Sequence, residues 1–148
     1  MKRMPCEAAS TLFNTGSVQP TFAQVAAFID FHLGLGSEAD PEALACWILL
    51  SGEALRERKV RVEFARALET TATRLADAIR SGVQQKAFTC ESIGGAASAI
   101  VATIQGYFVL AATARTVIPK GSAAASTKRM AEGLLRPVRP FPEPEGRP

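Results

Sequence analysis

The stretch Ile100-Val-Ala-Thr-Ile-Gln-Gly-Tyr-Phe-Val-Leu-Ala-Ala112 decides the fold of this chain. It is apolar on all sides of a helix, with a step of Gln105, Gly106 and Tyr107 set into it. A helix of this composition cannot face water, and it is too short and too interrupted for a persuasive membrane span, so it requires a packed neighbour. We predict that this neighbour is another copy of the same chain.

Hydrophobic periodicity on both sides of this stretch predicts an all-α chain of about five helices. The first predicted helix covers 21–33 and ends at Gly34. A second begins at Pro41 with Asp40 as its N-cap, and its Leu, Ile and Trp residues predict that it is largely buried. The remaining helices are predicted over 60–83, 91–116 and 122–135. No strand-like alternation of useful length and no internal repeat is present in the sequence.

The order of these elements predicts one domain over 21–136. Residues 1–20 contain scattered proline and glycine and are expected to be a flexible lead-in. Residues 137–148 contain five prolines and are expected to be a disordered tail.

The cysteines and the amino-terminal residues favour a cytoplasmic setting. Cys6, Cys46 and Cys90 are odd in number and match no metal-binding spacing, and the first residues lack the apolar core of a signal peptide. Cys46 stands among Ala45, Trp47 and Ile48, so we expect a buried, inert thiol there.

Charge and reactive groups argue against an enzyme and against a nucleic-acid-binding face. The net charge is only +3, and much of the basic surplus lies at the two ends of the chain. A catalytic site would need a nucleophile with a base, paired carboxylates or a metal shell. The chain has one histidine, His32, which excludes a His-rich zinc site. We expect no catalytic residue, no metal and no cofactor.

The helix over 91–116 carries two lines of side chains that imply two different partners. One line, Ile93 to Ala111 at helical spacing, is suited to packing on the rest of its own chain. The other consists mostly of small residues and suits a symmetry mate, as an isologous helical interface requires. The second line contains Gly95, Ala99, Ala102, Gly106, Leu110 and Thr113.

Three segments resemble the C-terminal, ligand-binding and dimerising domain of tetracycline-repressor-like (TetR) transcriptional regulators. Residues 28–34, FIDFHLG, resemble the helix that follows the DNA-binding domain in a subset of these proteins. Residues 47–64 resemble the family's Trp-centred helix and the charged corner after it. Residues 104–111, IQGYFVLA, are similar to a step in the first dimerisation helix. The resemblance spans roughly 21–136.

This resemblance implies a homodimer and a small apolar or aromatic ligand. The dimer would be a four-helix bundle made from the last two helices of each chain, to which Met130 and Leu134 would contribute. The ligand would enter a cavity among the first four helices. Its candidate lining residues are Phe28, Phe31, His32, Trp47, Phe64, Leu68, Ile104, Tyr107 and Phe108.

The chain also departs from the family's pattern at its beginning. Family members carry a helix-turn-helix domain before this region, whereas here about twenty unpatterned residues precede it. We therefore expect the DNA-binding half to be absent from this chain, so that the chain alone does not bind DNA.

Other interpretations remain open at this stage. The chain could be a stand-alone helical interaction module that forms homo- or heterodimers, and the aromatic residues could simply fill its core. Residues 96–118 could instead associate with a membrane, which would require Gln105 and Thr103 to be tolerated in lipid.

Overall fold

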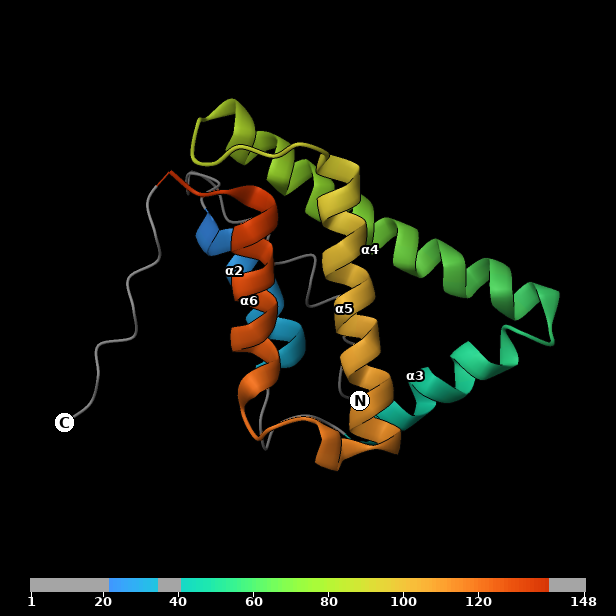
Figure 1. Cartoon of the computed structure of the whole chain (residues 1–148). Helices are drawn as coiled ribbons and strands as arrows, with labels where there is room; N and C mark the ends of the chain where they lie inside the picture. The colour runs from blue at the N-terminus through green and yellow to red at the C-terminus, as the bar shows by residue number, and fades with distance from the viewer. Residues whose placement is uncertain (1–21, 35–40, 139–148) are drawn as a thin grey trace.

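The computed structural model describes residues 22–34 and 41–138, and within them it is all-helical (Figure 1). The elements in chain order are α2 (Phe22–Leu33), α3 (Pro41–Glu53), α4 (Arg58–Gln84), α5 (Ile93–Thr113), the 3-10 turn η2 (Arg115–Val117) and α6 (Ser122–Leu135). The all-α prediction is therefore confirmed. Extended pairing in the described part of the chain is limited to one bridge between Phe88 and Pro137.

The core lies where α2, α5, α6 and the C-terminal half of α4 meet. The apolar stripe of α4 turns inward there, and Leu75 and Ile79 have no exposed surface. Other fully covered side chains come from the remaining three helices: Ile29, Ile100 and Leu135. An ion pair between Asp30 and Lys128, 2.9 Å apart, joins α2 to α6 at the edge of this body.

The N-terminal half of α4 extends away from this body, and α3 runs from the tip of α4 back toward the far end of α5 (Figure 1). We call α3 together with residues 58–69 of α4 the arm. Glu57 accepts a hydrogen bond from the backbone N–H of Lys59, which places the start of α4 two residues before the predicted 60–83. In the arm α3 contacts both α4 and α5, so the three helices form a triangle.

The last turn of α4, just before the connection to α5, requires glycine at position 82. A Cβ atom there would lie 2.3 Å from the Phe88 ring, so only glycine lets the ring lie against the helix. The backbone N–H of Val138 donates to the carbonyl of Ala87 at 3.1 Å. The first two residues of the expected tail thus pair with this connection, and residues 139–148 lie outside the described part, as does the lead-in.

Two sequence predictions about α3 are wrong. No residue of α3 is buried, although the helix was expected to be largely buried. Leu50 is 40% exposed, and Leu55, just after the helix, is 81% exposed. The thiol of Cys46 is exposed as well. The physical reason is position, because a helix at the edge of the arm is covered on one side only. The expected N-cap, Asp40, lies outside the described residues.

Helix limits elsewhere agree with the sequence to within a few residues. The helix predicted over 91–116 ends earlier, at Thr113, and continues as η2. At its beginning, Ser92 accepts a hydrogen bond from the N–H of Gly95. The helix predicted over 122–135 is observed with these limits.

Candidate ligand site and dimer face

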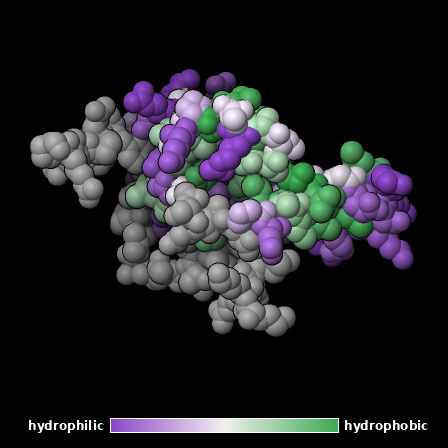
Figure 2. Space-filling model, turned by 90° about the horizontal axis from the view of Figure 1, so that it is seen from below, coloured by the Kyte–Doolittle hydropathy of each residue, from purple (hydrophilic) through white to green (hydrophobic). Residues whose placement is uncertain are grey.

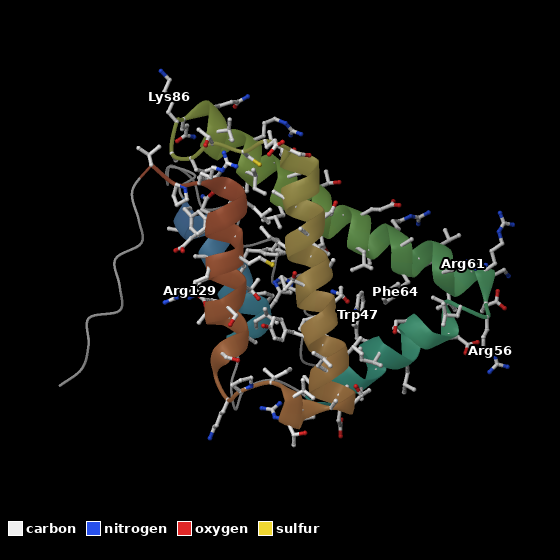
Figure 3. All side chains as sticks on the ribbon, in the orientation of Figure 1. Trp47, Arg56, Arg61, Phe64, Lys86 and Arg129 are labelled. Atoms are coloured by element: carbon white, nitrogen blue, oxygen red, sulfur yellow. The ribbon has the colours of Figure 1, made fainter. Side chains whose placement is uncertain are left out.

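Side chains from three helices meet inside the triangle formed by α3, α4 and α5. The rings of Trp47 on α3 and Phe64 on α4 have centroids 4.6 Å apart and an interplanar angle of 36° (Figure 3). The indole Nε1–H of Trp47 donates a 2.6 Å hydrogen bond to Oε1 of Gln105 on α5. All three side chains are half-buried. We call these three residues the Trp47 cluster.

The Trp47 cluster gives each polar atom at its centre a partner. An indole N–H that leaves water needs an acceptor, and a glutamine oxygen within a helix as apolar as α5 needs a donor. The indole nitrogen only donates, so the atom that faces it must be the amide oxygen. Sequence reasoning singled out Trp47 and Phe64 but missed Gln105 as their partner. The polar step in an apolar run was the available signal.

A second aromatic group lies at the C-terminal end of α2. The ring of His32 is 4.4 Å from that of Phe28 and 5.1 Å from that of Phe31, measured between centroids. His32 Nδ1 lies 2.8 Å from the carbonyl oxygen of Phe28, so Nδ1 carries the hydrogen and donates. Burial lowers the pKa of His32 below 6.5, and the hydrogen bond to Phe28 opposes this shift. The imidazole is therefore neutral at pH 7, with Nε2 as an acceptor.

The structure thus divides the nine candidate ligand residues into separate groups. Phe28 and Ile104 are 1% exposed and belong to the core. Leu68 and Phe108 are half-buried and pack against it, and Tyr107 is also half-buried. Trp47 and Phe64 are brought together in the arm. A surface pocket of about 420 Å³ lies at the beginning of α4, lined by Arg58, Lys59, Val62 and Glu63, none of which was a candidate.

The line of small residues on α5 is open to solvent in the single chain. A Cβ atom built on Gly106 would meet no atom within 4 Å. Beside it Val109 is 45% exposed, and across on α6 Met130 and Leu134 are 38% and 36% exposed. Of the remaining residues of the expected face, Ala99 and Leu110 are half-buried. The others are exposed: Gly95, Ala102 and Thr113. We call this surface of α5 and α6 the α5–α6 face.

The opposite side of α5 packs within its own chain. Ala97, Ile100 and Ile104 are at most 1% exposed. Among the described helices of sufficient length, α5 alone has the length and apolar composition of a membrane span. It contacts α2, α3, α4 and α6, so it is the central helix of the bundle.

An all-helical body, an arm with a polar and aromatic centre, and an open face on the last two helices agree with what the resemblance to the C-terminal domain of TetR-like transcriptional regulators implies. The chain belongs to this family: the family model described as BetI-type transcriptional repressor, C-terminal, matches residues 22–136. The resemblance identified in the sequence is thereby confirmed. No curated protein and no solved structure matches the chain.

Proposed function

We propose that this chain is a non-enzymatic ligand-sensing and dimerisation domain of a transcriptional regulator and acts in the cytoplasm. Membership of the family, over residues 22–136, supports the regulatory role. The single observation that carries the dimer is the α5–α6 face, which presents small and apolar side chains of two adjacent helices to solvent. Two such faces related by a two-fold axis form a four-helix bundle.

The composition of the α5–α6 face suits close packing of helices. Gly106 leaves space on the middle of α5, and Val109, Met130 and Leu134 supply apolar surface around it. Small residues allow two helix backbones to approach, while larger apolar groups around them remove surface from water. The interior side of the same helix is already filled, so the second copy is the partner that the small-residue line fits.

Light scattering coupled to size-exclusion chromatography tests the dimer with a matched pair of variants. Val109 and Val62 are 45% and 46% exposed, but only Val109 lies on the α5–α6 face. We expect the unchanged chain and Val62→Glu to elute at twice the monomer mass of 15.7 kDa. Val109→Glu places a charge in the interface and should elute as a monomer. A monomeric unchanged chain, or equal behaviour of the two variants, contradicts the proposal.

The same measurement addresses the alternative of a stand-alone interaction module. That module would use the same exposed strip to bind a different helix, so its homodimer would be weak. Mixing the chain with an intact regulator of the family and observing mixed dimers in place of homodimers would support it.

Ligand sensing is proposed for the triangle of α3, α4 and α5. The Trp47 cluster supports this location, because apolar rings with a few oriented polar groups are what small-molecule sites present. Small apolar or aromatic compounds should raise the unfolding temperature of the dimer in a thermal-shift screen. In the regulator, such a ligand would favour one dimer state over another. Absence of any stabilising compound from a broad aromatic library contradicts a sensing role.

A further inference from the structure

We propose that Trp47 occupies the binding site of this domain as an internal ligand, and that the external ligand is a planar aromatic molecule with an in-plane N–H or O–H donor. This inference rests on the proposed sensing function and names the class of ligand and its mode of entry. The ligand displaces the indole ring of Trp47 from Phe64 and from Gln105.

The geometry of the Trp47 cluster specifies the chemistry of the replacement. The ring of Phe64 lies against the indole ring at 4.6 Å, which requires a flat, apolar group of similar extent. The oxygen of Gln105 accepts a hydrogen bond at 2.6 Å from the edge of that ring. A replacement without a donor leaves this oxygen without its partner, which weakens its binding.

Because α3 is attached by few buried contacts, displacement of Trp47 requires little free energy. No residue of α3 is buried, and on the same helix Leu49 is 74% and Leu50 40% exposed. Figure 2 shows that the arm projects from the body, with hydrophobic surface along it and hydrophilic surface toward its tip. The fully buried residues of α4 and α5 lie outside the arm, so we expect withdrawal of Trp47 to leave the core intact. A helix without buried residues belongs to the part of a fold that opens at the lowest free-energy cost.

Fluorine NMR follows the displacement directly, because the chain contains one tryptophan. Protein labelled with fluorotryptophan gives a single resonance, from position 47. Indole is the probe, and N-methylindole is the matched compound without the N–H. We expect indole to move the resonance in a saturable manner toward its position in the unfolded chain. N-methylindole should bind at least about tenfold more weakly, which is the usual effect of one lost neutral hydrogen bond.

Variants separate displacement of Trp47 from unspecific binding. In Trp47→Ala the internal ligand is absent, so calorimetry should show indole binding about tenfold or more tightly than in the unchanged chain. Gln105→Met removes the acceptor and should abolish the preference for indole over N-methylindole. Gln85→Met, at the exposed end of α4, is the control and should retain that preference. Circular dichroism confirms that each variant is folded.

Three results overturn the inference: a resonance that millimolar indole leaves unmoved, equal affinities for indole and N-methylindole, or no tighter binding by Trp47→Ala. The samples are kept dimeric, and their mass is measured by light scattering. An intact dimer that is stabilised by other compounds but ignores indole rejects this inference alone. A chain that binds no compound at all rejects the proposed sensing function.

Discussion

The substitution Gly106→Ala distinguishes an α5 that packs against a second copy from an α5 that stays exposed. The two states predict changes in stability of opposite sign. In the single chain the added methyl group meets no atom within 4 Å. Alanine in a helix interior is about 1 kcal/mol more favourable than glycine, so a chain that never dimerises should become more stable by about that amount.

In the proposed dimer the same methyl group enters the contact between two helices. Overpacking of a filled contact costs about 1–3 kcal/mol, and the two-fold axis introduces the methyl group twice. The dimer is therefore expected to lose at least about 2 kcal/mol, which raises its dissociation constant about 30-fold. The unfolding free energy of the dissociated monomer should still rise.

Sedimentation equilibrium over a dilution series gives the dissociation constant, and urea unfolding at low concentration gives the stability of the monomer. Gly52→Ala on α3 is the control, because a Cβ atom there also meets nothing within 4 Å and α3 lies outside the α5–α6 face. It should leave dimerisation unchanged. A Gly106→Ala dimer as tight as the unchanged one would refute close approach of the two helices at this position.

Four further predictions concern the single chain. Because burial lowers the pKa of His32 in the folded state, the unfolded state binds more protons below pH 6.5. Urea unfolding should therefore show that the free energy of unfolding falls as the pH decreases from 7 toward 5.5. The variant His32→Phe should flatten this slope. Leu75→Ala, at a side chain with no exposed surface, should cost about 2–5 kcal/mol in the same assay. Leu55→Ala, at an 81% exposed side chain, should change the free energy of unfolding by less than about 0.5 kcal/mol. Mass spectrometry after brief alkylation of the native protein should find Cys46 modified before the half-buried Cys90, whereas equal rates would contradict the exposed position of α3.

Hydrophobic periodicity in the sequence correctly predicted the features that depend on a single helix. The limits of α6 and the inward stripe of α4 follow from spacing within a single segment, because a continuous apolar stripe must be covered. The two faces of α5 were predicted for the same reason. The exposure of α3 was not predictable in this way. Apolar composition indicates that burying a helix would be favourable, but it does not indicate whether another element lies against that helix.

The partners of the candidate site depend on how helices cross, which spacing does not fix. Trp47 and Gln105 are 58 residues apart in the chain. Their hydrogen bond exists because α3 runs from the tip of α4 toward the C-terminal end of α5 and contacts both helices (Figure 3). The same uncertainty explains why the candidate aromatic residues separate into core and arm groups.

The geometry of α5 explains how one helix can carry a site and an interface together. Each residue of an α-helix is rotated by about 100° from the previous one, so three successive residues point in three directions. Ile104 is 1% exposed in the core, Gln105 holds the indole of Trp47, and Gly106 lies on the open face. Because Gln105 and Gly106 are adjacent, a ligand that replaces Trp47 would act one residue away from the proposed contact between the two copies. If indole alters the dissociation constant of the dimer by some factor, dimerisation must alter the affinity for indole by the same factor, since the two equilibria are linked.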